Sequence, residues 1–239
     1  MIEKIESPEL FNDWEKRDLF SVRILALLKS YGCKYQFATF YRQIIDGKVT
    51  AVISRLDRDV TLSVTDGFDN EELVRFFCVV GYSSILSNDK FFISPRFEEG
   101  LVMACDIKKE PALGCATVDE YPKLMDLFNF VDYDEQDFKA WYVDISHRVR
   151  HNTAKAYTLN VDNTTVSSGI LSSVIDGYSV LTAVRTENEF RKMGYGSALV
   201  SYICSDVKGR VYIMVDSEKN INFYSRLGFT ENEKWRMYR

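Results

Sequence analysis

The chain has 239 residues, of which 46% are hydrophobic and 27% charged, with only 4 prolines and 12 glycines. This composition excludes a fibrous or disordered chain and predicts a folded protein of one large or two small domains. The net charge of -5 provides no general basic face, so we expect no nucleic acid partner. Cationic small molecules are a better electrostatic match.

Membrane and disulfide classes are also disfavoured. The N-terminal residues carry three glutamates and no apolar run of signal-peptide length. No stretch approaches the roughly 20 apolar residues of a transmembrane helix, so we expect no membrane partner. The five cysteines are odd in number and lack CxxC spacing, which argues against a disulfide framework and a zinc site. The sequence therefore predicts a cytoplasmic protein with reduced thiols.

The first hundred residues alternate between helical and extended patterns. Apolar residues at helical spacing end at Gly32, with a candidate break near Arg17, and the turn Asp46-Gly47 joins two extended segments into a hairpin. The predicted order is a helix, three antiparallel strands, a second helix and a fourth strand. The first helix is expected at residues 8–31, the three strands at 35–44, 49–55 and 60–64, and the second helix at 70–80.

A domain boundary is expected where these patterns weaken, between Pro95 and Pro111. It gives domains 1–110 and 111–239. The elements expected after it lie at residues 115–118, 121–130, 135–149, 154–161, 165–175, 178–186, 197–205, 211–215, 218–227 and 229–238. Because the element order partly recurs, the sequence predicts two α+β halves.

A glycine-containing segment follows the expected strand 178–186 and opens the next helix. It comprises Arg191, Lys192, Met193, Gly194, Tyr195, Gly196 and Ser197. Glycines let the backbone approach a ligand closely, and the N–H groups at a helix N-terminus favour a phosphate. Arg191 and Lys192 add positive charge there. A dinucleotide-binding fold is disfavoured because Leu199 stands where a third glycine is needed, and no GK[ST] of a Walker A loop is present.

This segment resembles the pyrophosphate-binding motif R/Q-x-x-G-x-G/A of the GNAT N-acetyltransferase superfamily, through Arg191, Gly194 and Gly196. Residues 222–229, NFYSRLGF, are similar to a second motif of that family, L/F-Y-x-K-x-G-F. The resemblance covers residues 116–239 and implies the α+β GNAT fold, a mixed and mostly antiparallel sheet flanked by helices. The first half looks like a degenerate GNAT domain without the motif, so it is not expected to bind cofactor.

The resemblance also implies roles for particular residues. Acetyl-CoA would bind the C-terminal half, with no metal, and an amine would attack the thioester directly. The pantetheine arm would pair with the backbone of a splayed strand at Val184, Arg185 and Thr186. The pyrophosphate would be held by N–H groups of Lys192, Met193, Gly194, Tyr195, Gly196 and Ser197. Tyr224 would protonate the leaving thiolate, while a backbone N–H of the splayed strand would stabilise the oxyanion.

Two positions depart from the family pattern. Many relatives carry an asparagine seven residues before the tyrosine, where this chain has Ser217, a residue that also suits a helix N-cap. The position that holds a general base in some relatives falls near Val180, which cannot take a proton. Glu187 and Glu189 lie in the following loop, so the base is unassigned.

Other residues have competing interpretations. His147 and His151 lack a third metal ligand and are expected at the surface or a cleft edge. Trp141 and Tyr142 are expected in the core. A group of acidic residues either steers a cationic amine or is a solvated surface at helix starts: Asp119, Glu120, Asp126, Asp132, Asp134, Glu135 and Asp137.

The function expected from the sequence is transfer of acetyl from acetyl-CoA to a primary amine, on a small molecule or a peptide. A non-catalytic acyl-CoA-binding sensor or regulatory module is the alternative, and a structural tandem protein without ligand is a third. Tyr224 could equally be a packed aromatic residue. The sequence does not specify the acceptor amine or the oligomeric state.

Overall fold

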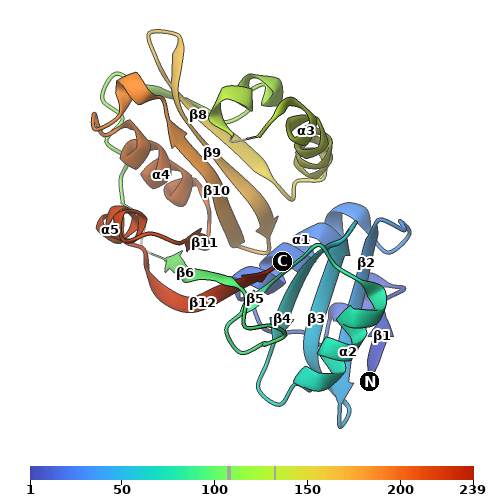
Figure 1. Ribbon diagram of the computed structural model, residues 1–239. Helices are drawn as coiled ribbons and strands as arrows, with labels where there is room; N and C mark the ends of the chain where they lie inside the picture. Colours follow the sequence, from blue (N-terminus) through green and yellow to red (C-terminus); the bar gives the residue numbers. More distant parts are fainter. Residues whose placement is uncertain (107–108, 132) are drawn as a thin grey trace. The chain divides into compact units, whose positions relative to one another are not determined.

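The structure, a computed structural model, describes residues 1–106, 109–131 and 133–239. The chain forms two compact units (Figure 1). Unit 1 consists of Met1–Val102, Met214–Asp216 and Asn232–Arg239, and unit 2 of Met103–Ile213 and Ser217–Glu231. The units are therefore not continuous in sequence, and the expected domain limits of 1–110 and 111–239 remain a prediction.

Unit 1 is a sheet with helices. Its elements in chain order are β1 (Ile2–Lys4), η1 (Pro8–Phe11), α1 (Leu19–Tyr31), β2 (Ala38–Ile45), β3 (Lys48–Leu56), β4 (Asp59–Val64), α2 (Asn70–Val80) and β5 (Ser84–Asn88). The strand order is β1-β2-β3-β4-β5-β12, where β12 (Thr230–Tyr238) comes from the end of the chain. Only β4 and β5 are parallel among these neighbours.

The two helices of unit 1 cover opposite faces of its sheet. Val52 of β3 packs in one core cluster with Leu27 of α1, whereas Ile53 packs in another with Phe77 of α2. Successive side chains of a strand point to opposite faces, which places α1 and α2 on different sides. Helix α1 begins at Leu19 because Asp18 caps it by accepting from the Ser21 N–H at 2.7 Å.

Unit 2 repeats the same layering. Its elements are β7 (Thr117–Asp119), η2 (Leu124–Phe130), α3 (Glu135–Arg150), β8 (Lys155–Val161), β9 (Thr164–Ile175), β10 (Tyr178–Thr186), η3 (Asn188–Phe190), α4 (Tyr195–Asp206), β11 (Arg210–Val215) and α5 (Glu218–Arg226). The strand order is β11-β10-β9-β8-β7, and β10 and β11 are the parallel pair. Strand β6 (Glu98–Cys105) contains the point at which the chain passes from unit 1 to unit 2.

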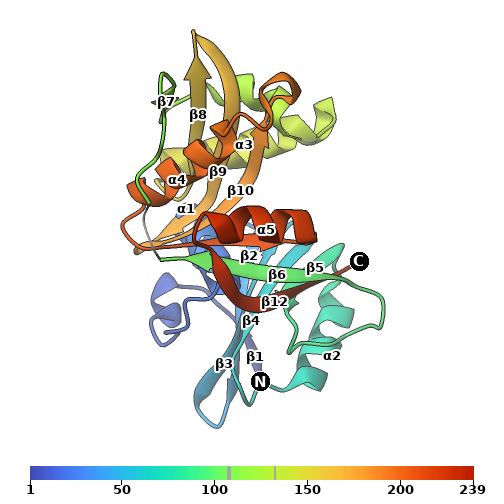
Figure 2. The ribbon, with the colours of Figure 1, turned by 90° about the vertical axis from the view of Figure 1, so that its left-hand side faces the viewer.

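Helices α3 and α4 cover opposite faces of the unit 2 sheet, as Figure 2 also shows. Ile170 of β9 packs with Phe138 and Ile145 of α3. A side chain at the neighbouring Gly169 would collide with Ile203 of α4, whose Cδ1 lies 2.8 Å from the position of an added Cβ. Glycine at this position therefore lets α4 approach the sheet closely.

The fold class expected from the sequence is confirmed: each half is α+β with a mostly antiparallel sheet flanked by helices. Several elements differ from expectation, among them β1 and η3, which were not expected. The helix expected over residues 8–31 is split at the proposed break into η1 and α1, and the helix expected over 121–130 is a 3-10 helix that begins only at Leu124, after Pro122. The segment expected to be irregular before Pro111 contains β6.

No helix in the described part of the chain is long and apolar enough to cross a membrane. No disulfide links the five cysteines, all of which lie within the described residues.

Candidate functional site

Strands β10 and β11 diverge within unit 2. Their pairing joins Tyr178–Val180 to Arg210–Tyr212 and ends there. Strand β10 continues to Thr186 beside β9. The edge of β10 that faced β11 is therefore released beyond Val180, as expected for the splayed strand.

The released part of β10 contains a bulge that the sequence did not indicate. Ala183 has a φ of 50°, and the register with β9 shifts between Thr182 and Arg185. Val184 lies inside this shift. The end of the strand is held by Ser167 of β9, whose Oγ donates to the Arg185 carbonyl at 2.8 Å and lies 3.0 Å from the Thr186 Oγ1.

The loop between β10 and α4 has an unusual backbone. Lys192 has a φ of 65° and Gly194, the N-cap of α4, a φ of 91°. The first helical hydrogen bond runs from the Ala198 N–H to the Gly194 carbonyl at 2.9 Å. A glycine cap has no side chain to accept the N–H groups that precede this bond, those of Tyr195, Gly196 and Ser197. This helix start is suited to hold an anion.

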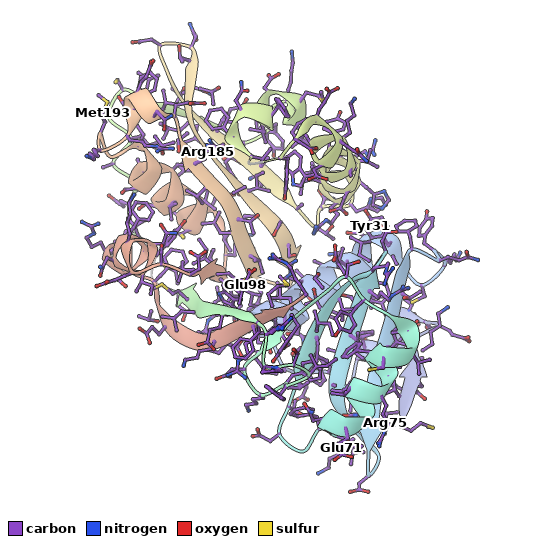
Figure 3. The ribbon with its side chains drawn as sticks, in the orientation of Figure 1. Tyr31, Glu71, Arg75, Glu98, Arg185 and Met193 are labelled. Atoms are coloured by element: carbon purple, nitrogen blue, oxygen red, sulfur yellow. The ribbon has the colours of Figure 1, made fainter. Side chains whose placement is uncertain are left out.

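The cations of the loop have different positions. Arg191 donates from Nε to the Thr186 carbonyl at 3.1 Å, so its side chain ties the loop to the end of β10. Lys192 is exposed. Met193 is 61% exposed, and Figure 3 shows it and Arg185 in the same half of unit 2. The structure therefore brings the three strand residues and the loop residues predicted from sequence to one end of unit 2.

Gly196 is required by packing. An added Cβ would lie 2.9 Å from the Thr186 Oγ1 and 3.9 Å from Cζ of Phe223. The helix start, the end of β10 and α5 are thus in close contact. Phe223, at the L/F position of the second motif, closes this corner of the site.

Tyr224 lies on α5, is 7% exposed, and packs against Phe223 and Phe229 at centroid distances of 4.9 and 5.4 Å. Burial, with a smaller contribution from Cys204, raises the pKa of the Tyr224 hydroxyl. The phenol therefore remains protonated at neutral pH, as a proton donor must. Its catalytic role remains a prediction.

The structure provides no general base at the expected position, because Val180 is fully buried and apolar. Glu187 is the N-cap of the short η3 segment after β10, and Glu189 lies within that segment. Ser217 is the N-cap of α5, and its hydroxyl accepts from the Asn220 N–H at 3.4 Å. The N-cap interpretation of Ser217 is therefore confirmed.

The histidines and the acidic residues have structural explanations. The rings of His147 and His151 stack at 4.1 Å near the end of α3, and the described residues contain no group of three or more potential metal ligands. Asp134 caps α3, and Glu135 pairs with Lys139 at 2.7 Å. Asp132, another member of the acidic group, lies outside the described residues.

Trp141 and Tyr142 contact the aromatic ring of Phe138 on α3 and pack against a buried cluster. Each is partly buried rather than fully exposed. This supports the expectation that they belong to the core.

The family model described as "Acetyltransferase (GNAT) family" matches residues 116–229. A search of curated proteins found no significant match. Among solved structures, a GCN5-related N-acetyltransferase from Kribbella flavida is 14% identical, with a TM-score of 0.58 over 92% of this chain and 93% of that one. A GNAT-family acetyltransferase from Colwellia psychrerythraea is 10% identical, with a TM-score of 0.55 over 99% of this chain and 98% of that one.

A tandem GNAT protein from the clavulanic acid biosynthesis pathway is 9% identical, with a TM-score of 0.59 over 99% of this chain and 97% of that one. At these identities the similarity shows the fold. Together with the family model, it identifies the class: a two-unit protein with the tandem GNAT fold. Residues 116–229, slightly less than half of the chain, match the model of the GNAT acetyltransferase family.

Proposed function

We propose that unit 2 transfers an acetyl group from acetyl-CoA to a primary amine of a small molecule or a peptide. The observation that carries this proposal is the start of α4, where the glycine cap Gly194 follows Arg191 and Lys192 at the end of the diverging strand β10. The N–H groups there suit a pyrophosphate, and the free edge of β10 suits an extended pantetheine chain. The match of residues 116–229 to the GNAT family model supports acyl transfer as the reaction class.

The chemistry would be direct. The amine nitrogen forms a bond to the thioester carbon, and the carbon–sulfur bond breaks after a tetrahedral intermediate. Tyr224 would give its hydroxyl proton to the departing thiolate. A backbone N–H near the bulge at Ala183 would stabilise the oxyanion. With Val180 in the base position, the amine would arrive neutral, or would lose its proton to water or to a carboxylate such as Glu187 or Glu189.

One observation favours the non-catalytic alternative, an acyl-CoA-binding sensor or regulatory module. Val180 offers no base, and the Tyr224 side chain is almost completely buried. A binding module needs the phosphate loop, but it needs neither a general base nor an accessible proton donor.

Two measurements test the proposal in order. Calorimetric titration of the full chain with acetyl-CoA should show binding, and a structural protein without ligand would show no heat and no thermal shift. Release of free coenzyme A thiol is then followed with a panel of primary amines that includes polyamines, amino acids and peptides. Turnover with any of them supports the enzyme, whereas binding without turnover across the panel supports the sensor.

A further inference from the structure

Unit 2 contains a cavity of about 580 Å³ at the end of the sheet where β8 and β10 begin. Small-molecule sites typically have volumes of about 300–1,000 Å³. The wall includes Lys208, just after α4, whereas the phosphate loop precedes that helix. The 12 residues of α4 span about 18 Å, so the cavity and the proposed cofactor site lie at opposite ends of the helix.

Two hydroxyl groups of the cavity wall lack hydrogen-bond partners among the described residues. Ser179 of β10 is 1% exposed, and its buried Oγ has no partner. The buried Oγ of Ser146 on α3 has none either. An unsatisfied buried hydroxyl costs about 1–3 kcal/mol. A ligand atom or a water molecule in the cavity would satisfy it.

The acidic groups of the wall already have partners within the protein. Lys155 pairs with Glu120 at 2.6 Å and with Asp206 at 2.8 Å. The Tyr202 hydroxyl also donates to Glu120, and that of Tyr157 to Asp206. Hydrogen bonds from Lys155 and Tyr202 lower the pKa of Glu120, so its carboxylate stays ionised within this network. These acids are therefore unsuited to bind a cationic ligand.

The remaining charged side chains of the wall are both cations. The exposed side chains of Arg150, at the end of α3, and Lys208 make no hydrogen bond or ion pair with any residue that the structure describes. They come from opposite sides of the cavity, since α3 and α4 cover opposite faces of the sheet. Apolar side chains line the space between them: Leu124, Val149, Leu171 and Val174.

We propose that this cavity is a second ligand site, for a small molecule with an apolar body and an anionic end group such as a carboxylate. The anion would contact Arg150 or Lys208, the hydroxyl of Ser179 would donate to a ligand oxygen, and the body would contact the apolar wall. Such a site does not depend on acetyl transfer. Ser179 is the residue next to Val180, where β10 leaves β11, so a ligand there would lie beside the start of the divergence.

Three probes with the same six-carbon body test the charge preference: hexanoate, hexan-1-ol and hexylammonium, each titrated into the full chain by NMR. Hexanoate should bind at least tenfold more tightly than either of the others, equivalent to about 1.4 kcal/mol. Equal affinities, or no hexanoate binding at about 10 mM, would overturn the proposal.

Variants then locate the site. Arg150→Gln combined with Lys208→Gln should weaken hexanoate binding about tenfold or more and change that of hexan-1-ol by less than about twofold. The matched control is Arg75→Gln combined with Lys139→Gln, which removes the same charge from two exposed helix positions and should change neither. Equal losses in both double variants would show non-specific attraction and reject the site.

Ser179→Ala distinguishes a ligand partner from a packing residue. It should weaken hexanoate binding while leaving thermal stability equal or higher, because a buried hydroxyl without partner is removed. A loss of stability with unchanged binding would mean that the hydroxyl bonds only water. Saturating acetyl-CoA should leave the affinity for hexanoate unchanged. If acetyl-CoA competed with hexanoate, the probe would lie in the cofactor site, which would contradict a separate ligand cavity. This test does not depend on whether the protein acetylates amines.

Discussion

The two units contain the same strand divergence with different surroundings. In unit 1, β4 and β5 pair in parallel over Asp59–Thr61 and Ser84–Leu86, and β4 then continues to Val64. In unit 2, β10 and β11 also pair over three residues before β10 continues alone beside β9. The fold therefore supplies a diverging parallel pair in both units.

The helix that follows the divergence differs in charge. Helix α2 is capped by the carboxylate of Asp69, which accepts from the Glu72 N–H at 2.9 Å, and Glu71 and Glu72 lie in its first turn. Figure 3 shows Glu71 at this end of α2. Helix α4 has the bare cap Gly194 and no acidic residue in its first turn. Carboxylates at a helix N-terminus satisfy its N–H groups and repel a phosphate.

The divergence of unit 1 is also closed by side chains. Lys16 Nζ donates to the Val64 carbonyl at 2.8 Å and pairs with Asp18 at 2.5 Å. Asp18 in turn accepts from the Ser63 hydroxyl at 2.8 Å. The end of β4 is thus occupied by an internal polar network. Both units thus have the same fold. We expect the side chains around the diverging strands to decide whether a unit can bind an extended ligand such as pantetheine.

The largest effect is expected from Tyr224→Phe, which tests whether unit 2 differs from unit 1 in chemistry as well as in binding. The ring and its contacts with Phe223 and Phe229 are kept, but the proton donor for the thiolate is lost. Turnover should fall by about 10²- to 10⁴-fold with little change in the acetyl-CoA dissociation constant. Steady-state kinetics with a good acceptor, together with calorimetry, measure both.

Tyr238→Phe is the matched control. The Tyr238 hydroxyl is buried in unit 1 and donates to the Phe91 carbonyl at 2.7 Å, so its removal should lower stability without changing turnover. Unchanged turnover in Tyr224→Phe, when chemistry limits the rate, would assign the proton transfer to water or another residue. A loss explained wholly by weaker cofactor binding would make Tyr224 a packing residue.

A smaller effect is expected from Gly194→Val, compared with Gly67→Val in the loop between β4 and α2. The two glycines have φ angles of 91° and 85°, and an added Cβ would meet no atom within 4 Å at either. The backbone strain is therefore similar, about 1–3 kcal/mol for a non-glycine residue in a sparsely populated region. Only Gly194→Val should weaken acetyl-CoA binding, by more than about tenfold, as measured by calorimetry. Equal affinities in both folded variants would remove the assignment of the phosphate loop.

The smallest effect is on stability and concerns Glu233, which β12 places in unit 1. Burial, followed by the nearby Asp18 carboxylate, raises its pKa to about 7 from an ordinary value of 4.5. The folded state then holds this proton more tightly than the unfolded state does. Its contribution to stability is therefore most favourable below about pH 4.5 and is lost as the pH rises through about 7.

Glu233→Gln should match the parent in stability near pH 5 and exceed it at pH 8 by roughly 1–3 kcal/mol, at about 1.4 kcal/mol per pKa unit. Denaturant unfolding at both pH values measures the difference. Glu231→Gln, an exposed position on the same strand, controls for the lost charge. A Glu233→Gln advantage that did not grow with pH would show that the carboxyl is already ionised and solvated in the folded protein.

Much of the fold could be predicted because its signals are local. Asp46 and Gly47 have φ angles of 49° and 75°, the conformation for which this dipeptide predicts a tight hairpin turn. Strand β6 was missed although residues 101–105, LVMAC, form an apolar run typical of a buried strand. The charged residues around it masked that signal.

In the candidate site, the phosphate loop could be predicted from the sequence alone, since the two cations and the glycine cap lie within four residues directly before a helix. It did not predict the bulge at Ala183 or the support of Arg185 by Ser167, because neither residue type requires that conformation or partner. The cavity around Ser179 was also invisible, since its walls come from segments distant in sequence.

The place of the last strand was decided only by the tertiary structure. Residues 229–238 were expected to be a strand, and β12 is one, but it pairs Trp235 with Asn88 and so completes the sheet of unit 1. Alternating side chains identify a strand and its buried face. They do not specify its neighbour, because the backbone N–H and C=O groups that join two strands are the same for every residue except proline, and the available edge is set only once the chain has folded.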